Sequence, residues 1–396
     1  MAHPPAAMPF DHEQIRIDLL RERAFNLRWA SVDPGVIPLT AADPDFPCAP
    51  EIADAIARYA RGRYLSYAPA EGLSFFREAI SAYYHENRAV PYDAAHCIAC
   101  DSAAFGIYAV CKAYLQPGEE AIVFNPVDFL FKHCVERVGA HARLFEVPLD
   151  LYQTVNWQPL EDMIQPATKL ICLCNPLNPT GKVFSKDELM GLAAIAEKHN
   201  VMILSDEIWS DIVFAPYRYL SIASIPEAAE RTIIVTGFSK SYGLAGLRAG
   251  AILTPSAEHF NRVLEASGHQ STVHGCNVLA QVAATAALQE AQYWLYGFVS
   301  HLHRMRDITV EALNQMPGIT CMSPQGCYVA FANVKGTGFS AEQIQEQWLR
   351  ESGVAVVPGS PRWFGSKAEH HIRISFATSA EILHEAFQRI QNKSWA

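Results

Sequence analysis

Six short apolar runs alternate with helix-like stretches between about residues 95 and 255, and this alternation constrains the fold more than any other feature of the sequence. The runs lie at residues 98–100, 121–124, 170–174, 201–205, 232–236 and 250–253. Short apolar runs bounded by turn residues are typical of buried strands. Because strands that alternate with helices form a mainly parallel sheet, the sequence predicts an α/β fold for this region.

The length of the chain indicates more than one domain, since 396 residues exceed what a single hydrophobic core usually holds. We expect a large domain at residues 49–288. After it, helical patterns accompany shorter strands and predict a smaller α+β domain at residues 289–396. Residues 1–48 are expected to fold back and pack on this smaller domain.

The charge balance disfavours nucleic acid and anionic membranes as partners. Lys and Arg number 31 against 41 for Asp and Glu, which gives a net charge of −10. No apolar run approaches the roughly 20 residues of a transmembrane helix. The first ten residues lack the basic region and apolar core of a signal peptide, so we expect a cytoplasmic protein.

Ten cysteines raise the question of a metal or disulfide site. Cys97 and Cys100 have C-x-x-C spacing, but Cys172 and Cys174 are too close to each other to complete a zinc ribbon. We therefore expect no metal site. The cysteines are interpreted as reduced, buried small hydrophobes, which agrees with a reducing compartment.

A lysine follows the strand predicted at residues 232–236. Lys240 lies in a segment of small residues, with Arg248 eight positions later. A lysine amine becomes reactive when its surroundings lower its pKa or when it is linked to a carbonyl cofactor. A guanidinium matches the oxygens of a phosphate, which suits Arg248 to a phosphate clamp. The alternative is an ordinary surface lysine in a polar loop.

Two more predicted strands end in polar residues. The strand at 170–174 is followed by Asn175–Gly181, whose prolines and asparagines predict a rigid turn. The strand that begins at Val201 ends near Asp206, where the alternative to a functional carboxylate is a helix cap. Since loops at the carboxyl ends of parallel strands meet at one edge of a sheet, these residues and Lys240 are expected to lie together.

Taken together, these segments resemble the fold-type I pyridoxal-phosphate enzymes of the class I/II aminotransferase family. The resemblance implies that Lys240 binds pyridoxal 5'-phosphate covalently and that Ser239 and Arg248 bind its phosphate. It also implies that Asn178 donates to the phenolic oxygen of the cofactor and that Asp206 faces its pyridine nitrogen. A carboxylate there keeps the nitrogen protonated, which makes the ring a better electron sink. Lys240 and Asp206 are the expected catalytic residues.

The resemblance extends to the phosphate and the substrate. The segment Ser102, Ala103 and Ala104 is similar to a turn whose amides bind the phosphate at a helix N-terminus, with Ser102 in place of a glycine. Arg373, on a strand predicted to be half-buried, corresponds to the arginine that grips the substrate α-carboxylate. Ala42, with Asn178, is also expected to face the substrate.

The same family resemblance implies a homodimer. Tyr67 is similar to a tyrosine that reaches the phosphate bound by the partner subunit. Residues 269–275 are a candidate loop that enters the partner's active site. We therefore expect active sites at the interface between two copies of the chain.

Two residues depart from the family pattern. Trp209 stands where a tyrosine usually bonds the phenolic oxygen, and an indole N–H can donate but not ionise. Asp128 stands where an aromatic side chain usually stacks on the cofactor ring, unless neighbouring Phe129 takes that place. We expect Asp128 to face the cofactor or a cationic substrate group.

These observations favour an aminotransferase acting on the α-carbon of an amino acid. A β-eliminating C–S lyase is the alternative, because Asn26–Trp29, residues 37–46 and residues 205–212 are similar to the cystathionine β-lyase branch. A specialised elimination or cyclisation enzyme acting on a basic, arginine-like amino acid in secondary metabolism is a third interpretation. A regulatory cofactor-binding domain fused to a DNA-binding module is disfavoured, since the chain has no basic N-terminal extension.

Overall fold

The computed structural model describes residues 10–393. Residues 1–9 and 394–396 lie outside the described residues. The prediction that the first ten residues are not a signal peptide therefore falls almost entirely outside them. In the described range, no helix is both long enough and apolar enough to span a bilayer.

A seven-stranded sheet forms the centre of the molecule. Its spatial order is β2-β8-β7-β6-β5-β3-β4. Neighbours from β7 to β4 are parallel, whereas β8 runs antiparallel to both β7 and β2. The strands are β2 Cys97–Cys100, β3 Glu120–Asn125, β4 His141–Glu146, β5 Thr168–Cys174, β6 Met202–Asp206, β7 Thr232–Gly237 and β8 Gly250–Leu253.

All six strands expected in this region are present, and the mainly parallel sheet confirms the predicted α/β class. The sequence analysis missed β4. This strand lies at the edge of the sheet, and of its six residues only Phe145 is buried, so it lacks the apolar run that marks the others.

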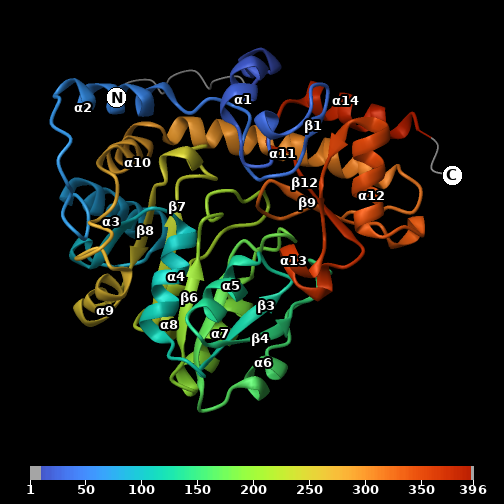
Figure 1. The fold of residues 1–396 in the computed structure, drawn as a ribbon. Helices are drawn as coiled ribbons and strands as arrows, with labels where there is room; N and C mark the ends of the chain where they lie inside the picture. Colours follow the sequence, from blue (N-terminus) through green and yellow to red (C-terminus); the bar gives the residue numbers. More distant parts are fainter. Residues whose placement is uncertain (1–9, 394–396) are drawn as a thin grey trace.

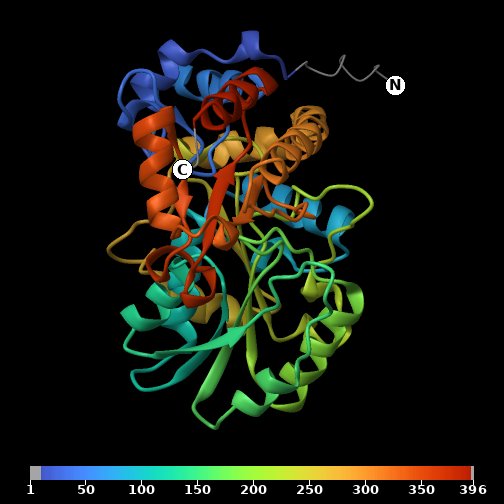
Figure 2. The same cartoon turned by 90° about the vertical axis from the view of Figure 1, so that its right-hand side faces the viewer.

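Helices cover both faces of the sheet. In Figure 2 the teal helices α4 (Ala103–Tyr114) and α5 (Leu130–Arg137) lie on one side of it, opposite the green helix α7 (Lys186–Lys198). Helix α7 begins at a capping box, in which Ser185 and Glu188 satisfy each other's backbone amides. The remaining helices of this part are α2 Pro50–Arg61, α3 Ser74–Arg88, α6 Gln158–Met163, α8 Pro226–Ala229, α9 Ala257–Ser267 and α10 Val278–Glu290.

The C-terminal part contains a smaller antiparallel sheet of order β11-β12-β9. Its strands are β9 Val329–Asn333, β11 Val357–Pro358 and β12 His371–Ser375, and its helices are α11 Gln292–Asn314, α12 Ala341–Gln347, α13 Pro361–Phe364 and α14 Ala380–Gln391. This combination confirms a smaller α+β part. The boundaries expected at residues 48 and 288 stay predictions.

The N-terminal segment lies against the C-terminal part, where Figure 1 shows the dark-blue helix α1 beside the red helix α14. Strand β1 (Ile37–Pro38) pairs in parallel with β10 (Val354–Ala355), and helix α1 spans Ile17–Arg23. A buried ion pair between Arg28 and Asp45 joins the two ends of the segment between them. The indole of Trp29 donates to the same carboxylate at 2.7 Å. These bonds hold the segment around Ala42 in place, and the Ala42 carbonyl contacts Lys240 just beyond strand β7.

Candidate active site

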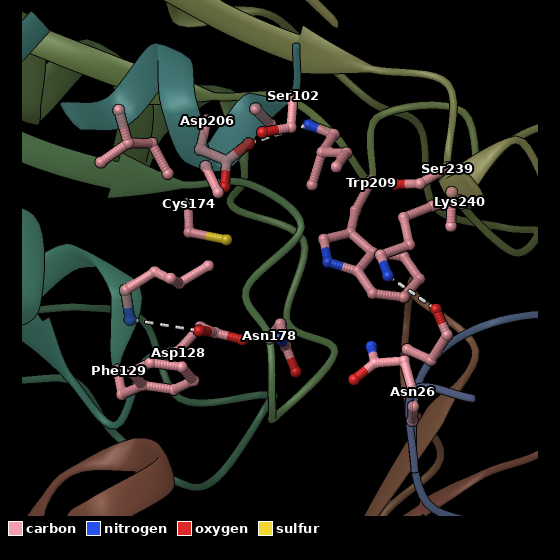
Figure 3. Close-up of a pocket in the computed structure, with 18 of the residues that line it drawn as sticks. Asn26, Ser102, Asp128, Phe129, Cys174, Asn178, Asp206, Trp209, Ser239 and Lys240 are labelled. Carbon is pink, nitrogen blue, oxygen red and sulfur yellow. Dashed lines mark hydrogen bonds between the residues drawn. The ribbon is translucent and has the colours of Figure 1, made fainter. Parts of the chain in front are cut away.

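A cavity of about 570 Å³ opens at the carboxyl ends of the parallel strands. Side chains from both parts of the chain line it, and Figure 3 shows them converging from several strand ends. The expected site residues that line this cavity are Ala42, Ser102, Ala103, Ala104, Asp128, Phe129, Asn178, Asp206, Trp209, Ser239, Lys240, Arg248 and Arg373. Of the predicted site residues, Tyr67 alone lies elsewhere.

Lys240 points into the cavity just beyond the end of β7. Its Nζ atom donates to the carbonyl oxygen of Ala42 at 2.6 Å and lies 5.4 Å from the centre of the Trp209 ring. Burial lowers the pKa of the amine below its ordinary value, and the nearby Arg373 contributes to the shift. A larger fraction of neutral amine at neutral pH suits a nucleophile and a base.

A partly buried polar network holds the chain directly after Lys240. Ser241 Oγ donates to Asp211 Oδ2 at 2.7 Å, and Arg88 from the end of α3 forms an ion pair with the same carboxylate. Asp211 lies five residues beyond Asp206. The network therefore connects the segment that carries Asp206 to the segment that carries Lys240. No sequence pattern predicts this network, since Arg88 and Asp211 are 123 positions apart.

Asp206 ends strand β6 and is buried at the floor of the cavity. One carboxylate oxygen accepts from the backbone amide of Ile208 at 3.1 Å. Burial, together with the like charges of Asp128 and Glu207, raises the pKa of Asp206 to about 7. A cation that enters the cavity would stabilise the ionised form of this carboxyl group and lower its pKa.

One end of the cavity, where Ser102 lies beside Asp206 in Figure 3, is suited to an anion. Helix α4, twelve residues long, begins there at Ala103, and Ser239 and Arg248 line the same end. The Ser102 hydroxyl accepts from the amide of Phe105 at 3.1 Å, so this side chain caps the helix. Gly250 of β8 runs against Ser102, where an added Cβ would lie 2.8 Å from its backbone. Close backbone approach therefore requires glycine at position 250.

Arg373, Asn178 and Asp128 form a polar cluster at one wall. Arg373 donates to Asn178 Oδ1 at 3.3 Å and to the Thr40 carbonyl at 3.2 Å, while its Nε has no partner. The Asn178 amide donates to Asp128 Oδ2 at 3.1 Å. The expectation of a half-buried strand around Arg373 is wrong, since all five residues of β12 are buried. Strand β12 is the central strand of its sheet and is covered on both faces.

The two departures from the family pattern both face the cavity. Trp209 is buried and packs edge to face on Tyr328, with ring centres 4.7 Å apart. Its indole nitrogen points into the cavity in Figure 3. Phe129 lies beside Asp128 at the wall and packs edge to face on Trp363 at 5.7 Å.

Tyr67 lies outside the cavity, with 87% of its surface exposed. Its ring packs against His274, with centres 5.6 Å apart. The candidate loop at residues 269–275 begins with a buried residue, because His269 stacks on Phe105 and bonds the carbonyl of Ala70 at 3.0 Å. Residues 270–272 and His274 are exposed.

Sequence reasoning assigned no role in the site to several residues that line it. Asn26 and Leu27 of the N-terminal segment form part of the rim, and the Asn26 side chain reaches toward Lys240 in Figure 3. Leu27 has a positive φ of 53°, and its carbonyl accepts from the Thr40 hydroxyl. These residues come from a segment without periodicity, so only the tertiary contacts reveal them.

The donor set fits pyridoxal 5'-phosphate. The unpartnered Nε of buried Arg373 calls for an anion such as a carboxylate, and the buried Asp206 calls for a cationic or protonated ring nitrogen. The start of α4 and Arg248 suit a phosphate. Among residues 10–393, no cluster of three or more His, Cys, Asp or Glu side chains is arranged to hold a metal ion.

Comparison with known proteins agrees with this geometry. Residues 34–390 match the family described as aminotransferase class I and II. A putative aminotransferase, YugH, of Bacillus subtilis is 33% identical over 364 residues, which cover 90% of this chain and 91% of the relative. An aspartate aminotransferase of Geobacillus stearothermophilus is 29% identical over 94% of each chain. The solved structure of a PLP-bound putative aminotransferase of Clostridium difficile 630 has a TM-score of 0.84 and 25% identity, and covers 90% of this chain and 92% of that one.

The fold and the site define a fold-type I pyridoxal-phosphate enzyme. The chain belongs to the aminotransferase class I and II family. The expected cofactor, pyridoxal 5'-phosphate, and the expected activity, an aminotransferase acting on amino acids, are thereby confirmed.

Proposed function

We propose the following roles for the residues of this aminotransferase. Lys240 binds the cofactor and then serves as the base for the substrate α-proton, since its amine is tethered in the cavity with a lowered pKa. Asp206 holds the proton on the ring nitrogen. The observation that carries this proposal is that one cavity contains the Lys240 amine, the buried Asp206 carboxyl and a free donor on Arg373.

When bound, pyridoxal 5'-phosphate supplies an electron sink for the carbanion formed at the substrate α-carbon. Arg248, Ser239 and the amides of Ala103 and Ala104 hold its phosphate end. Arg373 orients the amino acid by pairing with its α-carboxylate, which its unpartnered Nε supports. The Asn178 side-chain amide and the Trp209 indole line the same cavity and would supply N–H donors to the phenolic oxygen of the cofactor.

We also propose that the active enzyme is a homodimer acting in the cytoplasm. Residues 61–67 are all exposed and include the apolar side chains of Tyr64, Leu65 and Tyr67, which supports their burial against a second copy. The ten cysteines are unpaired, which supports a reducing compartment. Light scattering of the purified protein tests the dimer. Tyr67→Phe is expected to weaken cofactor binding if the hydroxyl reaches the partner's phosphate.

The reaction is tested by incubating the holoenzyme with a panel of amino acids, with and without a keto acid. Amino transfer that requires the keto acid is expected. Release of ammonia with pyruvate would instead identify a β-eliminating lyase, and a cyclised product would identify the third interpretation.

The role of Asp206 is tested by Asp206→Asn. This variant is expected to slow α-proton exchange by about a hundredfold or more while the cofactor stays bound, because an amide cannot hold the ring nitrogen protonated. A loss of less than tenfold would reduce Asp206 to a capping residue for the turn at Ile208.

A further inference from the structure

Asp128 is a carboxylate in a position from which it reaches the substrate. It lies in the turn between β3 and α5, and both oxygens already accept one bond, from Asn178 Nδ2 at 3.1 Å and from the amide of Leu130 at 3.2 Å. Each carboxylate oxygen keeps further acceptor capacity. Figure 3 shows the group at the cavity wall, opposite Lys240 and beside Phe129.

The turn that carries Asp128 is fixed from both sides. The amide of Val127 donates to the carbonyl of Phe364 at 3.1 Å, and the amide of Phe129 donates to that of Trp363 at 2.9 Å. The short helix α13 is thereby docked against the turn. Three aromatic rings, those of Phe129, Trp363 and Phe364, line the cavity together with Asp128. A carboxylate flanked by aromatic rings is a combination that favours a cation.

The charges of the cavity point the same way. Its cationic lining residues are Lys240, Arg248 and Arg373, which the proposed roles assign to the cofactor and to the α-carboxylate. The described residues of this chain therefore leave no cation there for a second substrate carboxylate. Asp206 is assigned to the ring nitrogen, and Asp101 lies beside Ser102 at the phosphate end. Asp128 is the acidic lining residue that these roles leave unassigned. Burial raises the pKa of its carboxyl, and the nearby Arg373 and Lys240 act against that shift by favouring the charged form.

A second cavity lies beside Asp128. This cavity, of about 320 Å³, shares Asp128, Phe129 and Phe364 with the first and continues along α5 toward Glu136. The residues common to both cavities form the wall between them. The second cavity is lined by Lys132 and Arg362 as well as by Glu136, so the preference for a cation is assigned to the first cavity alone.

We propose that Asp128 reads the substrate side chain and that the substrate class is amino acids with a cationic side chain, such as lysine, ornithine or arginine. This inference rests on the proposed placement of the α-carboxylate on Arg373. It distinguishes the chain from relatives named for aspartate, whose substrate carries a second carboxylate.

Asp128 has a second possible role, which is to position Asn178. Asp128 also orients Asn178, which in turn bonds Arg373. A residue that only positions Asn178 would affect every amino acid alike. A residue that reads a charge would affect cationic side chains alone.

The test uses binding to the apoenzyme, measured by calorimetry with reduced phosphopyridoxyl adducts of L-arginine and L-citrulline. These side chains have nearly the same shape and differ in charge. The arginine adduct is expected to bind at least about tenfold tighter, as a charge-assisted contact implies. Asp128→Asn should bring the two adducts to within about twofold of each other. The exposed Glu385, which lines neither cavity and pairs with Arg389, supplies the matched control Glu385→Gln, expected to keep the preference.

Equal binding of the two adducts by the wild-type chain would overturn the inference. So would an Asp128→Asn variant that weakens both adducts by the same factor, which would leave Asp128 as a positioning residue. Pyridoxal 5'-phosphate and the L-alanine adduct are measured in parallel. If these also fail to bind, the proposed cofactor site is wrong; if they bind while arginine and citrulline are not distinguished, only the substrate class is wrong.

Discussion

The Nζ atom of Lys240 lies 2.6 Å from the carbonyl oxygen of Ala42, a residue 198 positions earlier in the chain. The same carbonyl accepts from the hydroxyl of Tyr328 at 3.0 Å. The Lys240 amine, just beyond the end of β7, is thus held by the N-terminal segment, next to the residue that directly precedes β9 of the smaller sheet. Three distant parts of the chain meet at one acceptor.

Lys240 is expected to be the one lysine that retains the cofactor. Treatment of the holoenzyme with borohydride should remove the visible absorption band and attach the cofactor permanently, because reduction fixes the linkage to the amine. Peptide mass spectrometry locates the label. Lys240→Ala should carry none, whereas the control Lys169→Ala, an exposed lysine bonded to the Pro166 carbonyl, should be labelled like the wild type. A label on any other lysine contradicts the assignment.

Asp206 is expected to destabilise the apoprotein as the pH rises. Its pKa is about 7 in the folded chain against an ordinary value of 3.8, so the folded state holds a proton that the unfolded state has lost between these values. Stability attributed to Asp206 should be greatest below about pH 4 and decline up to pH 7, by at most about 4 kcal/mol. Urea unfolding of the apo wild type and of Asp206→Asn, compared at pH 4.5 and 7.5, isolates this term. A difference between the two proteins that does not change with pH would argue against it.

Arg248→Ala is expected to weaken cofactor binding. A guanidinium on a phosphate forms charge-assisted hydrogen bonds worth about 1.5–3 kcal/mol, so the dissociation constant should rise on the order of 10- to 100-fold. Fluorescence titration of the apoenzyme measures it. Arg231→Ala provides the control, since this arginine bonds Asn200 and Glu227 outside the cavity. If the dissociation constant of the cofactor is unchanged in Arg248→Ala, Arg248 does not bind the phosphate.

Trp209→Tyr is expected to shift the pH midpoint of the visible absorption band downward. A phenol O–H is a more acidic donor than an indole N–H, so a tyrosine at this position would stabilise the ionised phenolic oxygen of the cofactor more strongly. Spectroscopic titration of the holoenzyme gives the midpoint. Trp209→Phe serves as the matched control, because it keeps an aromatic ring against Tyr328 without a polar donor. A midpoint that is the same in all three proteins would mean that the residue only packs.

The sequence by itself determined the central sheet and the chemistry at its strand ends. Lys240, Asp206 and Asn178 each follow a run of buried apolar residues, and the carboxyl ends of parallel strands must lie along one edge. Local pattern is therefore enough to place them together. Strand β4 was not predicted, because an edge strand with exposed residues has no such run of apolar residues.

The tertiary structure alone decided what surrounds these residues. The contact of Ala42 with Lys240, the Arg88–Asp211–Ser241 network and the pairing of Asn178 with Arg373 join residues far apart in the chain. Such contacts depend on how the N-terminal segment and the smaller sheet pack on the large one, and packing leaves no periodic signal in the sequence. The protonation of Asp206 belongs to the same class, since the burial that raises its pKa exists only after the chain has folded.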